Sequence, residues 1–212
     1  MRLPRLYPIL DTAAVQARGW AVLPYAQALL EGGSEIIQFR HKGEFTRERF
    51  AQAQELGELV QAAGAAYVVN DRADIAALLD AALHLGQEDL PPAMARSLMG
   101  PDRAMGFSTH NRAQLAAAAQ EPVDYVALGP IFETNSKERP DPVVGLDGLH
   151  ACRSLTVHPL VAIGGITLET APHVLAAGAD SLAVINALAP VGATLADVRT
   201  LVETWKRLLE SA

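Results

Sequence analysis

The chain has 212 residues and half of them are hydrophobic, so a single large domain over residues 1–212 can bury a sizeable core. A formal net charge of −7 argues against a broad surface for nucleic acid or for an anionic membrane. The sequence contains no run of about 18 apolar residues, which argues against a membrane helix. The lone Cys152 excludes an internal disulfide, and a cytoplasmic location is expected.

Eight short apolar runs alternate with helical patterns along the chain. The runs cover 6–10, 35–40, 66–70, 82–86, 104–108, 125–129, 160–164 and 181–185. Helical spacing of apolar residues fills 21–32, 46–64, 111–120, 171–178 and 194–209, and Thr46 and Gly64 are placed to begin and end the second of these helices. Alternating strands and helices predict parallel strands. Eight such units predict an α/β fold of one (β/α)8 barrel, a TIM barrel, with an open doubly wound sheet as the alternative.

The second predicted strand ends in the polar segment QFRHK. In a (β/α)8 barrel, functional side chains lie at the C-terminal ends of the strands and in the loops that follow. Because side chains alternate along a strand, Gln38, Arg40 and Lys42 share one side, as an anion site requires, and His41 points to the other. The alternative is a polar strand end that faces water.

An acid follows each of the next two strands: Asp71 after the third and Asp89 after the fourth. Neighbouring strands lie about 4.8 Å apart, so both carboxylates can face one small volume. Two adjacent carboxylates repel unless they share a proton or a cation. Oxygen ligands without histidine or cysteine favour Mg²⁺, which commonly binds through one or two carboxylates and substrate phosphates. The alternative is that each acid caps the following helix.

The remaining strand ends carry hydroxyl groups, cations and glycines. Ser108 ends the fifth strand, and the long stretch 130–146 after the sixth is typical of a functional or disordered loop. Gly164 and Gly165 follow the seventh strand and leave backbone amides open to an oxyanion. Since the loops after strands seven and eight form a recurrent phosphate site in these barrels, we expect one here. A tight turn is the alternative for the glycines.

Seven segments of this chain, in their order, resemble the thiamine phosphate synthase family. They are QFRHK, VND, HLGQEDLP, GFSTHN, DYVALGPIFETNSK, AIGGIT and AVINAL, and the resemblance extends over residues 6–188. It implies a (β/α)8 barrel, usually a homodimer, that acts in thiamine biosynthesis. The implied reaction joins hydroxymethylpyrimidine diphosphate to a thiazole phosphate and releases diphosphate. Mg²⁺ is the implied cofactor, the partners are small molecules, and neither nucleic acid nor membrane is expected.

Matched position by position, the resemblance implies three groups of site residues. The pyrimidine diphosphate would be contacted by Gln38, Arg40, Lys42, Asn70, Ser108 and Lys137. The thiazole phosphate would be contacted by Thr134, Asn135, Ser136, Gly165, Ile185 and Asn186. Asp71 and Asp89 would hold Mg²⁺. Charge on the leaving diphosphate would be stabilised by Arg40, Lys42 and Lys137, and Ser108 would meet the aminopyrimidine, which makes these four the catalytic candidates.

Two positions depart from the family's pattern. His41 stands where the family usually has Glu, and Ser136 replaces a second Thr in the loop but keeps the hydroxyl group. The related thiazole tautomerases typically have His where Pro130 stands and lack the acid at Asp89, so both positions favour the synthase. A catalytically silent phosphate-binding or regulatory barrel is the third reading.

Overall fold

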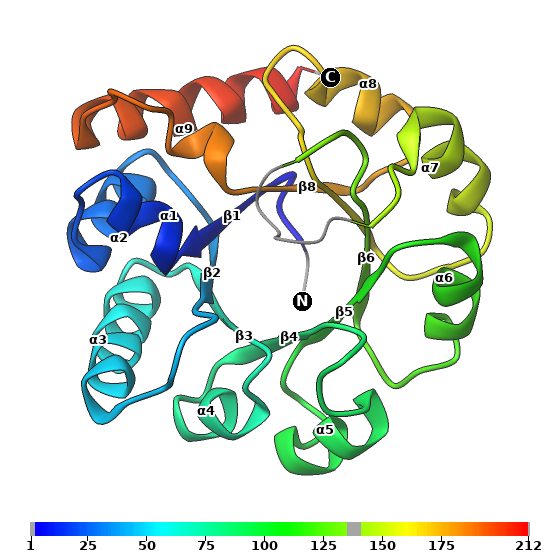
Figure 1. Cartoon of the computed structure of the whole chain (residues 1–212), viewed down its shortest axis with the longest axis horizontal. Coiled ribbons are helices and arrows are strands. Elements are labelled where there is room, and N and C mark those ends of the chain that lie inside the picture. The colour runs from blue at the N-terminus through cyan, green and yellow to red at the C-terminus, as the bar shows by residue number, and fades with distance from the viewer. Residues whose placement is uncertain (1–2, 135–140, 212) are drawn as a thin grey trace.

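Eight parallel strands close into a barrel in sequence order in the computed structural model, which describes residues 3–134 and 141–211 (Figure 1). The strands are β1 (Leu6–Asp11), β2 (Ile36–Arg40), β3 (Ala66–Asn70), β4 (Ala82–Leu85), β5 (Met105–Thr109), β6 (Tyr125–Leu128), β7 (Leu160–Ile163) and β8 (Ser181–Val184). Each predicted run lies within one residue of an observed strand. The (β/α)8 prediction is confirmed, and the open-sheet alternative is wrong because β8 pairs with β1.

Helices surround the barrel on its outside (Figure 1). They are α1 (Thr12–Ala17), α2 (Val22–Glu31), α3 (Arg47–Ala62), α4 (Ala73–Leu78), α5 (Pro92–Met99), α6 (Arg112–Ala118), α7 (Gly145–Arg153), α8 (Ala171–Ala176) and α9 (Leu195–Glu210), with a short 3₁₀ turn, η1 (Asn186–Leu188). The sequence patterns predict no helical range at α1, α4, α5 or α7. None of the helices in the described ranges has the length and apolarity that crossing a membrane requires.

The predicted ends of α3 are confirmed. The Thr46 side chain accepts a hydrogen bond from the backbone N–H of Arg49 at 3.2 Å, which satisfies one of the helix's unpaired donors. Gly64, just beyond the helix, has φ +73°, a left-handed conformation that glycine adopts at low cost.

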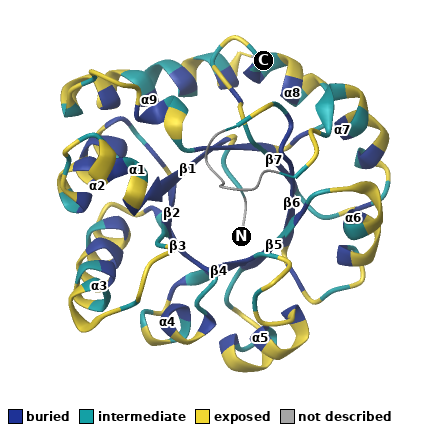
Figure 2. Cartoon of the chain, in the orientation of Figure 1, coloured by how far each residue is buried: buried dark blue, intermediate teal, exposed yellow. Residues whose placement is uncertain are grey.

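Buried residues lie along the barrel strands and on parts of the surrounding helices (Figure 2). Their contacts form an outer and an inner core. The outer core lies between strands and helices and includes fully buried Phe39, Leu56 and Trp205. The inner core consists of Tyr7, Ile9, Ile36, Val68, Tyr125, Ala127, Val161 and Ala183. Two of its members are tyrosines, so the inner core carries hydroxyl groups as well as apolar surface.

Candidate active site

The end of β2 places an amide and a guanidinium on the inner side of the barrel. Gln38 pairs in register with Ile9 of the inner core, whereas Phe39 packs in the outer core, so the predicted alternation holds. Arg40 pairs with Asp11 at the end of β1, and its guanidinium donates to the Asp11 carboxylate. Because the carboxylate of Asp11 also accepts from the first turn of α1, it fixes Arg40 to the barrel frame.

Two neighbours of Arg40 have different surroundings. The ammonium of Lys42 donates to Asp71 Oδ2 at 2.6 Å, so the cation reaches the predicted acid pair. His41 forms hydrogen bonds instead through Nδ1 with Thr12 Oγ1 at 2.8 Å and through Nε2 with the Glu44 carbonyl at 3.2 Å. The His41 ring is thereby hydrogen-bonded to the first residue of α1 and to the loop after β2.

The paired acids are not helix caps. Arg72 and Pro91 occupy the cap positions of α4 and α5, and neither helix has a side-chain cap hydrogen bond. Asp71 instead has φ +66°, a left-handed conformation that asparagine and aspartate tolerate better than most residues. Asp89 Oδ2 accepts from the Gly86 N–H at 2.7 Å, which closes the loop after β4. The capping alternative for both acids is therefore wrong.

The electrostatics of Asp71 show that the two acids share one volume. The pKa of Asp71 is raised to about 6: burial is the largest cause, the adjacent Asp89 carboxyl adds to the rise, and Lys42 opposes it. A carboxylate raised in this way gains from a nearby cation. Among the residues that the structure describes, no group of three or more His, Cys, Asp or Glu side chains could enclose a metal. Two carboxylates without further protein ligands suit Mg²⁺, which takes its remaining ligands from water and phosphate.

Asn70 offers an unused donor beside this pair. It ends β3, is 8% exposed, and its side-chain Nδ2 is buried without a hydrogen-bond partner in the described ranges. A buried donor left unpaired costs roughly 1–3 kcal/mol unless something pairs with it. An incoming polar ligand would provide that partner.

Ser108, at the other side of the mouth, is held by a buried histidine. His84 Nε2 lies 2.9 Å from Ser108 Oγ, and His84 Nδ1 lies 3.1 Å from the Tyr125 hydroxyl. Burial lowers the pKa of His84 to about 4, with Asp89 opposing that shift and Lys42 adding to it, so the ring is neutral at neutral pH. Burial also raises the pKa of Tyr7, which contacts Tyr125, to about 12.

The sequence reading missed four residues of this region: Asp11, Tyr7, His84 and Tyr125. A signal existed for His84, a polar residue inside the otherwise apolar run ALHL. No comparable signal marks the tyrosines, because a strand tyrosine normally packs as part of the core. Their roles follow only from the register of the closed barrel.

The predicted phosphate loop closes tightly against the loop after β6. Gly164 and Gly165 have φ +101° and +65°, and a Cβ on Gly165 would lie 2.5 Å from the Glu133 carbonyl oxygen. The Phe132 N–H donates to the Gly164 carbonyl at 3.0 Å. Both glycines are therefore required by backbone conformation and by close packing against the loop after β6, which fits the tight-turn alternative as well as a phosphate site.

The other predicted thiazole phosphate contacts are only partly described. Thr134 is half-buried after β6, and Ile185 and Asn186 follow β8 directly, with Asn186 exposed. These positions follow the same ends of the strands as the Gly164–Gly165 turn. Asn135, Ser136 and Lys137 lie outside the described residues.

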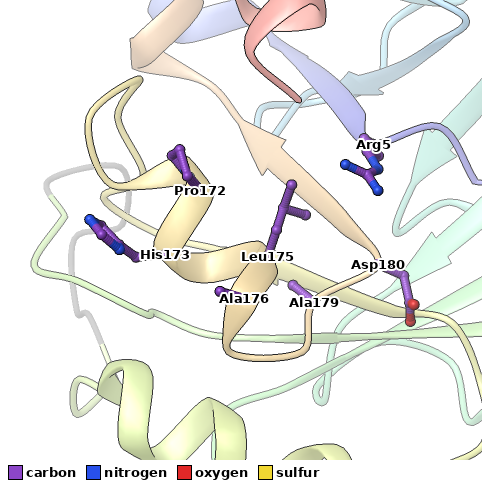
Figure 3. A pocket seen from close by; sticks show the side chains of 7 residues that line it. All are labelled: Arg5, Pro172, His173, Leu175, Ala176, Ala179 and Asp180. Carbon is purple, nitrogen blue, oxygen red and sulfur yellow. The ribbon is translucent and has the colours of Figure 1, made fainter. Parts of the chain in front are cut away.

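A separate hollow of about 530 Å³ lies at the opposite end of the barrel (Figure 3). Its lining includes Arg5, which precedes β1, and Asp180, which precedes β8. Asp180 there accepts hydrogen bonds from Arg153 and from the Leu160 N–H. This end of a (β/α)8 barrel commonly contributes to stability, and none of the predicted site residues lines the hollow.

The barrel, its cationic β2 end, its paired acids and its glycine turn define a (β/α)8 enzyme that handles phosphorylated substrates. The family model for thiamine monophosphate synthase matches residues 6–188. The chain belongs to this family and is a transferase of thiamine biosynthesis.

Individual relatives support this assignment over the whole length of the chain. The thiamine-phosphate synthase of Koribacter versatilis is 44% identical over 214 residues, which cover 100% of this chain and 98% of the relative. The thiamine-phosphate synthase of Chloroflexus aurantiacus is 39% identical over 93% of this chain and 90% of the relative. The solved thiamine phosphate pyrophosphorylase of Pyrococcus furiosus has a TM-score of 0.84 at 32% identity, with 98% and 96% covered.

Proposed function

We propose that the C-terminal mouth of the barrel is the active site and that it joins hydroxymethylpyrimidine diphosphate to a thiazole phosphate. The observation that supports this most strongly is the arrangement around β1, β2 and β3. Arg40, Lys42 and the unpartnered side-chain nitrogen of Asn70 lie there, next to the carboxylates of Asp71 and Asp89. Such a mixture of cations, donors and acids fits a diphosphate that arrives with a divalent metal.

Binding of the diphosphate would use cations that are already positioned. Arg40 is fixed by Asp11, and its side chain is 17% exposed, so it is largely removed from water yet still reachable. The Lys42 side chain is 56% exposed and able to turn from Asp71 to a phosphate oxygen. Fixed charges in a partly desolvated site stabilise developing negative charge better than water does.

The reaction needs a good leaving group rather than a protein nucleophile. The bond between the pyrimidine methylene carbon and the diphosphate oxygen breaks, and its electron pair leaves with the diphosphate. The thiazole nitrogen then donates its lone pair to the methylene carbon and forms the new C–N bond. Arg40, Lys42 and Lys137 would stabilise the departing charge, and Ser108 would contact the aminopyrimidine.

Asp71 and Asp89 fit a Mg²⁺ ion, which when bound would neutralise charge on the diphosphate. The raised pKa of Asp71 supports this assignment, because a cation between the two carboxylates removes their repulsion. Lys42 forms an ion pair with Asp71, so a cation already lies beside this acid.

The thiazole phosphate would occupy the turn after β7. Backbone amides at Gly164 and Gly165 would approach a phosphate oxygen. The remaining contacts would come from Thr134, Asn135, Ser136, Ile185 and Asn186. This places the second substrate on the β6–β8 side of the mouth and the pyrimidine diphosphate on the β2–β5 side.

We also propose that the enzyme is a cytoplasmic homodimer, as the family resemblance implies. Light scattering of the purified protein measures its mass directly. A mass near twice 22.5 kDa supports the dimer, and a mass near 22.5 kDa rejects it.

The test of the proposed reaction is product formation from both substrates with and without Mg²⁺. We expect thiamine phosphate and diphosphate only when the metal is present. A carboxylated thiazole phosphate, supplied as a competing substrate, examines the tautomerase alternative. Isomerisation of that thiazole without coupling would support the tautomerase, and binding of both substrates without any reaction would support a silent barrel.

A further inference from the structure

A chain of hydrogen bonds crosses the interior of the barrel and ends at Ser108. Gln38 Nε2 donates to the Tyr7 hydroxyl at 3.0 Å, and the Tyr7 and Tyr125 hydroxyls lie 2.8 Å apart. Tyr125 contacts His84 Nδ1 at 3.1 Å, and His84 Nε2 contacts Ser108 Oγ at 2.9 Å. Gln38, Tyr7 and Tyr125 are each at most 2% exposed, so this contact chain is shielded from water.

The donor and acceptor groups of these residues determine which residue donates in each hydrogen bond of the series. The Gln38 amide nitrogen can only donate, so the Tyr7 oxygen accepts. Tyr7 has a single hydroxyl hydrogen, and its remaining partner in the described part of the chain is Tyr125, so Tyr7 donates to Tyr125. Tyr125 in turn donates its hydrogen to His84 Nδ1.

The direction then passes through the imidazole. Because Nδ1 accepts, the proton of the neutral His84 ring lies on Nε2, and Nε2 donates to Ser108 Oγ. The ring is also held by stacking on Tyr125, with centroids 5.5 Å apart and planes at 29°. Ser108 Oγ therefore accepts a hydrogen bond from His84. The Ser108 hydroxyl hydrogen is left to donate to a partner that is not part of this series of hydrogen bonds.

We propose that His84 and Tyr125 are positioning residues that make Ser108 a dedicated hydrogen-bond donor toward the pyrimidine substrate. The inference rests on the proposed function, in which Ser108 meets the aminopyrimidine. A hydroxyl with this orientation selects an acceptor, such as an sp² ring nitrogen with its lone pair. A donor at the same place would meet only the second lone pair of Oγ and would leave the Ser108 hydrogen without a partner, so it is the less favourable occupant.

The tautomer of His84 tests the direction without any substrate. Nitrogen-15 NMR of ligand-free protein with labelled histidine reports which ring nitrogen carries the proton, and His84→Gln identifies the His84 signals by their loss. We expect the proton on Nε2. A proton on Nδ1 would show that the chain runs the other way, with Ser108 donating to His84, and would overturn the proposal.

Tyr125→Phe tests the consequence for binding, and Tyr67→Phe is its matched control. Tyr67 is a buried strand tyrosine of the outer core, and its hydroxyl donates to the Ala53 carbonyl at 2.8 Å. Tyr125→Phe removes the donor to His84 Nδ1, so we expect a mixture of His84 tautomers. We also expect kcat/KM for the pyrimidine diphosphate to fall roughly tenfold to hundredfold, as for a lost buried hydrogen bond.

The pattern of effects separates positioning from general damage. The KM for thiazole phosphate should stay within about threefold in Tyr125→Phe, and Tyr67→Phe should change neither substrate's constants. An unchanged tautomer and unchanged kcat/KM in Tyr125→Phe, or equal losses in the two variants, would reject the proposal. If the wild-type protein forms no product, the proposed function fails, whereas the tautomer measurement still decides the direction of the chain.

Discussion

Replacing His84 with glutamine should make the enzyme's free energy of unfolding less dependent on pH below 6.5. Burial lowers the pKa of His84 from 6.5 to about 4 in the folded protein. Above pH 6.5 both states carry a neutral ring, so the residue makes no pH-dependent contribution there. As the pH falls from 6.5 to 4 the unfolded state binds the proton first, and stability is lost over this window.

The size of that loss follows from the difference in pKa. One pKa unit corresponds to about 1.36 kcal/mol, so a lowering of this extent amounts to about 3 kcal/mol once the pH is below 4. Glutamine does not titrate. The free energy of unfolding of wild type should therefore fall by about 3 kcal/mol more than that of His84→Gln between pH 7 and pH 4.

Urea unfolding of both proteins across this pH range measures the effect. Tryptophan fluorescence and far-UV circular dichroism should give coincident transitions, which checks that a two-state treatment applies. His150→Gln is the matched control, because it makes the same replacement at an exposed histidine of α7. Parallel wild-type and His84→Gln profiles, within about 1 kcal/mol throughout, would refute the reasoning about the buried ring.

Three further predictions concern the mouth of the barrel. Asp71→Asn and Asp89→Asn should each lower turnover at least about a hundredfold, which is near 2.7 kcal/mol of barrier. Both should also raise the Mg²⁺ concentration that turnover requires, since a neutral amide is a weaker ligand than a carboxylate. Turnover measured against Mg²⁺ concentration checks both effects. His41→Glu should keep turnover within about tenfold of wild type, because the hydrogen bonds of His41 go to Thr12 and Glu44 and not to the anion site. Steady-state kinetics measure the turnover. Gly165→Ala should destabilise the fold by about 2 kcal/mol and raise KM for thiazole phosphate, because the new Cβ meets a backbone carbonyl oxygen. Gly64→Ala is the control, since it introduces the same left-handed strain at a position with no atom near the new Cβ.

Specific outcomes would contradict each of these. Full turnover with an unshifted Mg²⁺ requirement in both asparagine variants would remove the acids from the site. A loss beyond tenfold in a folded His41→Glu protein would give that residue a role in the chemistry. Equal destabilisation of Gly165→Ala and Gly64→Ala, with an unchanged KM, would show that the turn after β7 is shaped by strain alone.

The fold was accessible from the sequence because each barrel strand is buried on both sides. Such strands appear as short apolar runs, and their number and alternation with helices are nearly sufficient to predict closure. The predicted runs match the eight strands within one residue at either end. No helical range was predicted for α1, α4, α5 or α7, whose six to nine residues give little periodicity to recognise.

The positions of the proposed site residues were predictable wherever a residue follows its own strand. Gln38 and Arg40 are correctly placed by alternation along β2, and Asp71 and Asp89 by the spacing of adjacent strands. Interactions that depend on pairing across the barrel were not predictable. The contact of Tyr7 with Tyr125 joins residues 118 positions apart and exists only in the closed register.

A crystal structure of the enzyme with Mg²⁺, diphosphate and thiamine phosphate tests the central claim most directly. We expect a metal between the carboxylates of Asp71 and Asp89, diphosphate oxygens on Arg40 and Lys42, and the thiamine phosphate group at the Gly165 turn. Diphosphate bound elsewhere, for example in the hollow beside Arg5 at the opposite end, with Asp71 and Asp89 still free of metal, would contradict it.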